Sequence, residues 1–263
     1  MPHNRSGQLL SALSAFPLTR QCFGSFIQWA CANVEGGFED YDLIDAIEKN
    51  ETDRLRKCEE LLVRSRNILG LKDDAFSKAF GFSNDLLTND TEKIHDILAE
   101  PLFVVDLNNH GFREIKKLPQ YIGSGSEKKR NSDFLATRGE MRFAIELKTI
   151  RMENKPKPAP GKLLGNSAKP YWWGEMFRNN AMMKIENKNQ KALSQLDNAC
   201  RHYGCEKKML VLYTRRLSTS SLMTKGAYVE ELKLLKEKYP NVDYFSCKDY
   251  FGMVSFFPEL NGT

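Results

Sequence analysis

The first hundred residues carry apolar positions at helical spacing and show no convincing strand alternation. Residues 91–98 illustrate the pattern, with Thr91 as a suitable N-cap and Ile94, Ile97 and Leu98 on one face. Glycine favours the left-handed conformation that closes a helix, so glycines mark the expected ends of other segments. We therefore predict an all-helical N-terminal region with helical segments at 23–32, 42–70, 73–80 and 91–98.

The pattern changes after residue 108. Residues 132–137 and 141–150 predict two strands joined by a short turn, which together form a β-hairpin. The nearly all-apolar run 208–213 is typical of a buried parallel strand. Residues 112–122 suit either a short helix or an irregular strand. Further helices are expected at 171–183, 188–203 and 224–238, further strands at 242–246 and 253–257, and a loop at 151–170.

This order of elements predicts a helical region followed by an α/β domain. We place the helical N-terminal region at 1–90 and the α/β domain at 91–263. The balance of charge also differs between the two parts of the chain. Residues 1–105 hold 11 Lys and Arg against 17 Asp and Glu, whereas residues 106–263 hold 28 against 17. A basic C-terminal part favours a polyanion as partner, although an uneven solvated surface would produce the same asymmetry.

Several classes of protein are disfavoured. No apolar run is long enough to span a membrane, and the N-terminus lacks the pattern of a secretory signal. The six cysteines form no Cys-x2-Cys pair and no zinc-ligand spacing with histidine, so we expect reduced thiols in a cytoplasmic, intracellular protein. The four histidines are scattered, and no Gly-rich phosphate loop of the ATP-binding type is present.

Glu-x-Lys occurs seven times, so the surroundings have to select among the copies. Only Glu146 and Lys148 lie inside an otherwise apolar predicted strand. Alternate residues of a strand share a face, which puts both side chains on the face of Ala144 and opposite to that of Phe143. Two charged groups in a core strand are costly unless they are paired or bound to a metal.

Asp133 begins the preceding predicted strand, and the short turn brings it near Glu146. Two carboxylates from adjacent strands form an oxygen site that suits Mg²⁺ or Mn²⁺, and the carbonyl of Leu147 would supply a further oxygen. Such a metal lowers the pKa of a bound water and polarises a phosphodiester, while Lys148 would orient the water or stabilise the transition state. The alternative is an ordinary salt bridge of Asp133 or Glu146 with Lys148.

The segments NSDFLA at 131–136 and FAIELKT at 143–149 resemble the PD-(D/E)xK, restriction-endonuclease-like superfamily. The resemblance covers roughly residues 90–215, with Ser132 standing where many members have proline. It implies a fold in which helices flank a mixed β-sheet, and an enzyme that cuts DNA with Mg²⁺. It also implies that Asp133 and Glu146 bind the metal and that Lys148 is catalytic.

The resemblance adds two candidates from helices. Members often carry a glutamine on the helix after the hairpin, where Gln195 is the candidate catalytic residue. Tyr203 follows at a spacing that does not match the Gln-x-x-x-Tyr pair of one branch. Members also often add an acidic residue from the preceding helix, and Glu100 is the candidate metal ligand, ahead of Glu92 and Asp96.

The basic loop before the hairpin would border this site. Its residues Lys128, Lys129 and Arg130 are candidates for phosphate contacts. The sequence thus predicts a Mg²⁺-dependent DNA endonuclease of the restriction or defence type, for which double-strand cutting would favour a homodimer. Two alternatives remain open: a non-catalytic nucleic-acid-binding or regulatory protein whose N-terminal region binds a protein partner, and a repair or recombination nuclease.

Overall fold

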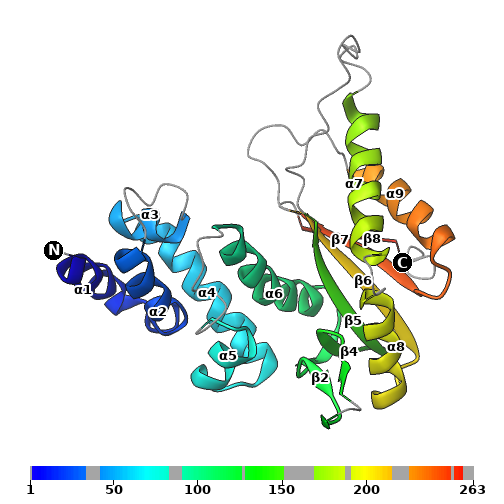
Figure 1. Cartoon of the computed structure of the whole chain (residues 1–263), viewed down its shortest axis with the longest axis horizontal. Coiled ribbons are helices and arrows are strands. Elements are labelled where there is room, and N and C mark those ends of the chain that lie inside the picture. The colour runs from blue at the N-terminus through cyan, green and yellow to red at the C-terminus, as the bar shows by residue number, and fades with distance from the viewer. Residues whose placement is uncertain are drawn as a thin grey trace. The chain divides into compact units, whose positions relative to one another are not determined.

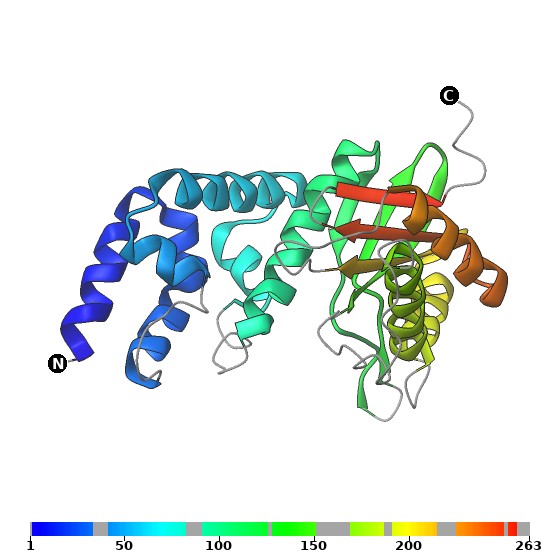
Figure 2. The same ribbon diagram turned by 90° about the horizontal axis from the view of Figure 1, so that it is seen from above.

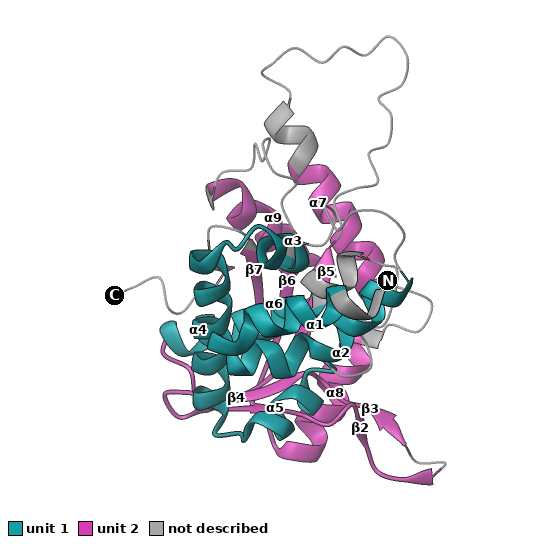
Figure 3. Cartoon of the chain, turned by 90° about the vertical axis from the view of Figure 1, so that its left-hand side faces the viewer, with its two compact units in different colours: residues 1–110 teal, residues 111–263 magenta. Residues whose placement is uncertain are grey.

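The chain consists of two compact units, Met1–His110 and Gly111–Thr263, which Figure 3 shows in teal and magenta. The computed structural model describes residues 2–33, 42–82, 91–125, 128–150, 169–186, 191–214, 225–249 and 252–256. The boundary differs from the one predicted at 90/91, because the helix that begins at Thr91 packs along a helix of the N-terminal unit. It therefore belongs to that unit.

Every described element of the N-terminal unit is helical, as predicted (Figure 1). The elements are α1 (Pro2–Ala12), the 3-10 turn η1 (Leu13–Ala15), α2 (Pro17–Asn33), α3 (Asp42–Glu48), α4 (Thr52–Leu69), α5 (Asp73–Ala79) and α6 (Thr91–Asn109).

Several helix boundaries in this unit differ from the prediction. Helix α1 and η1 were not expected, and α2 begins at Pro17 and not at residue 23. The expected segment 42–70 is divided into α3 and α4 near Asn50, which has a positive φ of 51°. The expected helix at 91–98 continues through Pro101 to Asn109. Apolar spacing did not reveal either of the last two features, because one depends on a single backbone angle and the other places a proline where it usually ends a helix.

The C-terminal unit is built on a six-stranded mixed sheet in the order β1-β4-β5-β6-β7-β8. β5 and β6 are parallel, as are β6 and β7, whereas the other neighbouring pairs are antiparallel. A second, two-stranded sheet pairs β2 with β3. The strands are β1 (Arg113–Lys117), β2 (Tyr121–Ile122), β3 (Lys129–Arg130), β4 (Phe134–Arg138), β5 (Met141–Ile150), β6 (Lys207–Thr214), β7 (Tyr244–Asp249) and β8 (Gly252–Phe256).

Three helices cover one face of the large sheet (Figures 1 and 2): α7 (Lys169–Glu186), α8 (Lys191–Tyr203) and α9 (Lys225–Lys238). They share a face because β5, β6 and β7 follow one another across the sheet and parallel crossovers are right-handed. Leu210 and Leu212 of β6 pack into this layer with Phe177 and Leu196. On the opposite face the ring of Phe143 contacts that of Tyr244 at 5.5 Å between centroids.

The predicted hairpin and central strand are confirmed. β5 spans the expected residues, β4 pairs with it in antiparallel register, and the run at 208–213 is the central parallel strand β6. The undecided stretch 112–122 forms the strands β1 and β2. Within the described part of the chain, no helix combines the length and apolar character needed to cross a membrane.

Leu210→Ala tests the central position of β6. Leu210 is fully buried between two parallel neighbours, so the substitution should lower the free energy of unfolding by about 2–5 kcal/mol, measured by urea denaturation. Leu234→Ala on α9 is the matched control, because Leu234 is 42% exposed and its loss should stay within about 0.5 kcal/mol. Equal losses would contradict the core assignment.

Candidate functional site

Asp133 lies immediately before β4, and its carboxylate continues the hydrogen-bond ladder of the hairpin. Its backbone N–H donates to the carbonyl of Ile145 at 3.1 Å, as a strand residue would. Its own carbonyl instead accepts from the N–H of Leu118, and its Oδ2 accepts from the N–H of Leu147 at 2.8 Å. The carboxylate is thereby fixed against the backbone of β5, beside Glu146.

Glu146 is completely buried within β5, with an exposed fraction of 0%. One carboxylate oxygen, Oε1, accepts a hydrogen bond from Nζ of Lys148, two residues along the same strand face. The other, Oε2, is buried and has no hydrogen-bond partner among the residues that the structure describes. A buried carboxylate oxygen without a donor is costly, so this oxygen is suited to a positively charged ligand.

The electrostatic surroundings keep Glu146 hard to ionise. Burial raises the pKa of its carboxyl well above the usual value, and the charge of Asp133 raises it further. The ammonium groups of Lys148 and Lys117 act in the opposite direction and lower this pKa. A buried carboxyl group whose pKa is raised beside a second carboxylate is a candidate for a functional site.

Lys148 has hydrogen-bond partners on its own strand and on helix α8. Its Nζ donates to Oε1 of Gln195 on α8 at 3.3 Å. Nε2 of Gln195 in turn donates to the carbonyl of Asn131 at 2.8 Å. The structure therefore brings the predicted residue Gln195 into contact with Lys148, in a position to orient its ammonium group.

Lys117 and Asn131 also belong to this network, although the sequence pattern predicts no role for either. Lys117, at the end of β1, has its Nζ 3.6 Å from Oδ1 of Asp133, and its side chain is only 11% exposed. It escaped notice because the structure of residues 112–122 was undecided. Asn131 donates through Nδ2 to the carbonyl of Pro119 and to the hydroxyl of Tyr203. Tyr203 therefore touches the network despite its unexpected spacing.

The oxygens around Glu146 fit a hard divalent cation. Asp133 and Glu146 supply two carboxylates, and Oε2 of Glu146 has no hydrogen-bond partner among the described residues. A strand residue points its N–H and carbonyl toward the same neighbour, so the carbonyl of Leu147 lies on the Asp133 side of β5. These are the oxygen types that Mg²⁺ and Mn²⁺ prefer.

A complete ligand set of side chains is not assembled. Among the described residues, no group of three or more His, Cys, Asp or Glu side chains is placed to hold a metal ion. Glu100 lies on α6 in the N-terminal unit, so its role as a metal ligand remains a prediction. The side chains of Glu92 and Asp96 lie outside the described residues, as do residues 151–168 of the expected loop.

The three basic candidates lie close to this network along the chain. Lys128, Lys129 and Arg130 are all exposed, and they lead directly into Asn131. Lys129 and Arg130 form β3, which pairs with Tyr121 and Ile122 of β2. The predicted basic loop is therefore in part a short β-ribbon.

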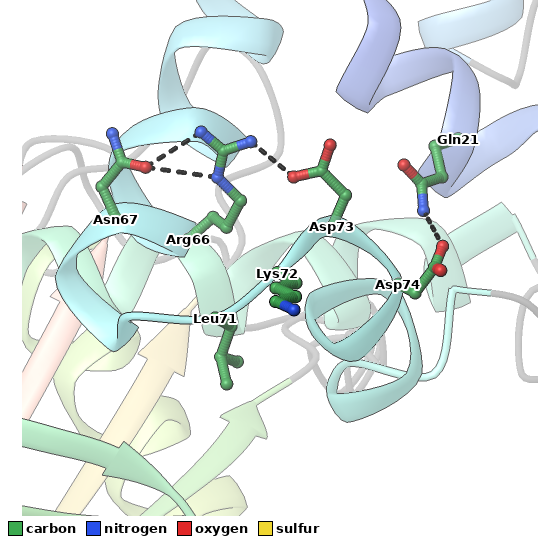
Figure 4. Close-up of a pocket in the computed structure, with 7 residues that line it drawn as sticks. All are labelled: Gln21, Arg66, Asn67, Leu71, Lys72, Asp73 and Asp74. Carbon is green, nitrogen blue, oxygen red and sulfur yellow. Dashed lines mark hydrogen bonds and ion pairs between the residues drawn. The ribbon is translucent and has the colours of Figure 1, made fainter.

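The N-terminal unit has a hollow of a different character (Figure 4). Nη1 of Arg66 donates to Oδ1 of Asp73 at 2.5 Å, and Nε2 of Gln21 donates to Oδ1 of Asp74 at 2.5 Å. Both carboxylates of the hollow therefore accept hydrogen bonds from within the unit, unlike the buried Oε2 of Glu146.

Comparisons with known proteins give no relative for this chain: no family model, curated protein or solved structure matches it.

The raised pKa of Glu146 predicts how metal-free stability depends on pH. A carboxyl whose pKa is higher in the folded chain holds its proton on folding, so unfolding becomes easier as the pH rises from the ordinary pKa through the folded one. Glu146→Gln removes this dependence and should stabilise the protein more at pH 8 than at pH 5.5, measured by denaturation in EDTA.

Glu186→Gln on α7 is the control for this effect. Hydrogen bonds from Tyr239 and Lys238 lower the pKa of Glu186, so its contribution to stability is complete above the ordinary pKa and is lost only in more acidic solution. Its removal should destabilise the protein equally at pH 5.5 and pH 8. If the gain in folding stability from Glu146→Gln does not grow with pH, the raised pKa assigned to Glu146 is wrong.

Proposed function

We propose that this protein is a metal-dependent nuclease of the PD-(D/E)xK type, with a restriction-endonuclease-like C-terminal unit that hydrolyses phosphodiester bonds in DNA. The observation that carries the proposal is the fully buried Glu146, whose Oε2 has no partner among the described residues while Asp133 and Lys148 lie beside it. A purely structural ion pair gives no reason for an unsatisfied oxygen at the centre of a sheet.

The arrangement of the strands supports the same proposal. The candidate residues come from an antiparallel hairpin, β4–β5, whose second strand continues into a parallel pair with β6. Helix α8, the second helix after the hairpin, brings Gln195 to Lys148. A mixed sheet with helices packed on it is the architecture that the resemblance implies.

Each residue has a role that follows from its place. Asp133 and Glu146 would hold Mg²⁺ or Mn²⁺, with the carbonyl of Leu147, and the bound metal would supply Lewis-acid polarisation of the phosphate and a water of lowered pKa. Lys148 would donate a hydrogen bond to a phosphate oxygen and stabilise its negative charge while the bond from the water oxygen to phosphorus forms and the bond from phosphorus to the leaving oxygen breaks. Gln195 keeps the ammonium of Lys148 pointed toward that position.

A second candidate is a non-catalytic nucleic-acid-binding protein on the same framework. The specific observation that favours it is the balance of charge, since Lys148 pairs with Glu146 and Lys117 pairs with Asp133. Two such pairs would keep the site neutral without a metal. This candidate predicts binding of nucleic acid without cutting under any divalent metal.

Lys148→Met tests the catalytic proposal. It should lower the rate of DNA cleavage at least about 100-fold, because charge in the transition state loses its donor. The assay uses plasmid, linear duplex, single-stranded DNA and RNA with Mg²⁺, Mn²⁺ or EDTA. Lys207→Met in β6 is the matched control: Lys207 is 26% exposed and Lys148 23%, and Lys207 also pairs with a carboxylate, Asp243.

The two candidate functions give opposite results in this assay. Metal-dependent cutting that survives Lys207→Met and disappears with Lys148→Met supports the nuclease. If the unmodified protein cuts none of the four substrates with any metal, or if Lys148→Met cuts as fast as the control, the nuclease proposal is wrong.

Metal binding can be measured without cleavage. A ligand that binds only the folded state at one hundred times its Kd stabilises that state by about 2.7 kcal/mol, so Mg²⁺ or Mn²⁺ should raise the Tm of the unmodified protein in a thermal scan. Asp133→Asn and Glu146→Gln should abolish this rise, since each removes a carboxylate ligand. An undiminished rise in both variants would place the metal elsewhere.

A further inference from the structure

We propose that the β2–β3 ribbon, of which the structure describes residues 121–125 and 128–130, is a docking element for double-stranded DNA that enters the major groove beside the candidate site. The proposal rests on the proposed function in taking DNA as the substrate. Figure 3 shows the ribbon projecting from the body of the C-terminal unit. Its two strands are antiparallel, with Tyr121 opposite Arg130 and Ile122 opposite Lys129.

The ribbon carries three consecutive basic residues, and two of them lie near the ring of Tyr121. Lys128, Lys129 and Arg130 are consecutive and exposed. Nζ of Lys128 lies 4.0 Å from the centroid of the Tyr121 ring, and the guanidinium carbon of Arg130 lies 5.9 Å from it. Both cations are thus placed against one ring, which limits their freedom before any partner binds.

Helix α8 extends this surface and fixes it. Nδ2 of Asn198 donates to the carbonyl of Arg130 at 3.1 Å, and Nη2 of Arg201 donates to Oδ1 of the same Asn198 at 3.0 Å. Asn198 therefore joins an exposed arginine of the helix to the arginine of the ribbon. Asp197, the acidic neighbour on α8, is paired with Lys208 at 2.7 Å.

The base of the ribbon is joined to the candidate catalytic lysine. The N–H of Asn131 donates to the carbonyl of Gln120, which closes the ribbon at its base. The carbonyl of Asn131 accepts from Gln195, and Gln195 accepts from Lys148. Two hydrogen bonds therefore separate the backbone of Asn131, the residue that follows the ribbon, from the ammonium of Lys148. DNA held by the ribbon would lie next to the site.

The shape of the ribbon selects among nucleic acids. The major groove of B-form DNA is about 12 Å wide and accepts a two-stranded β-ribbon, whereas that of A-form RNA is too deep and narrow for side chains to read. Single strands are usually held by aromatic rings that stack on bases. The Tyr121 ring is instead occupied by Lys128. These features favour duplex DNA as the occupant.

The test is binding of a labelled DNA duplex to the full chain in EDTA, where no cutting interferes. Lys128→Glu with Arg130→Glu should weaken the Kd at least tenfold. The slope of log K against log salt should fall in magnitude by about 2, because two phosphate contacts are lost. Lys184→Glu with Lys233→Glu, on α7 and α9, makes the same change in net charge and should alter the Kd less than twofold. All four residues lie on the surface, and equal Tm values would verify that the variants fold.

Competition with other nucleic acids completes the test. Duplex RNA and single-stranded DNA of the same sequence should compete at least tenfold less well than duplex DNA. The proposal is overturned if both double variants weaken binding equally. It is also overturned if duplex RNA or single-stranded DNA displaces the labelled duplex as well as unlabelled duplex DNA does at the same concentration. Cleavage is scored separately. Ribbon-dependent binding without cutting would refute only the nuclease, and cutting that is indifferent to the ribbon charges would refute only the ribbon.

Discussion

The burial of Glu146 in the middle of β5 is the constraint on which the site depends. Polar groups have to lie beside this carboxyl group because water does not reach it. Strand alternation directs its side chain toward the helix layer, together with Ala144 and Lys148. A carboxylate in such a place must be protonated, paired or bound to a cation. Lys148 satisfies one oxygen, and the other remains without a partner among the described residues. A hydrophobic residue would carry no such desolvation cost in this strand, so the presence of a carboxylate is consistent with the proposed chemistry.

The remaining contacts fix the geometry around that carboxylate mainly through the backbone. The N–H of Leu147 holds Asp133, and the carbonyl of Asn131 holds Gln195, which holds Lys148. Side chains fixed by strand register and by α8 would be preorganised, which is what the proposed electrostatic stabilisation of a transition state requires. The same contacts would link the β2–β3 ribbon to Lys148. In the proposed function, they would fix the distance between bound DNA and the catalytic lysine.

Local pattern predicted the core of the C-terminal unit well. The run 141–150 and its turn gave β5 and the hairpin, and the apolar run 208–213 gave the central strand, since both depend on short-range alternation and burial. Lys117 was missed because β1 is short, begins with a bulge and lacks clear alternation. Tyr203 was set aside because its spacing from Gln195 does not match Gln-x-x-x-Tyr. Its contact with Asn131 joins residues 72 positions apart, a separation that no spacing rule covers. The division at 110/111 depends on how α6 packs, which its own sequence does not reveal.

The most direct measurement is anomalous diffraction from crystals of the full chain grown with Mn²⁺, which reveals where the cation binds. The account predicts a peak bonded to the carboxylate oxygens of Asp133 and Glu146, with the carbonyl of Leu147 as a further ligand and Oε2 of Glu146 no longer without a partner. The account would be contradicted if saturating Mn²⁺ gave no peak at these oxygens and the pairs of Lys148 with Glu146 and of Lys117 with Asp133 remained in place.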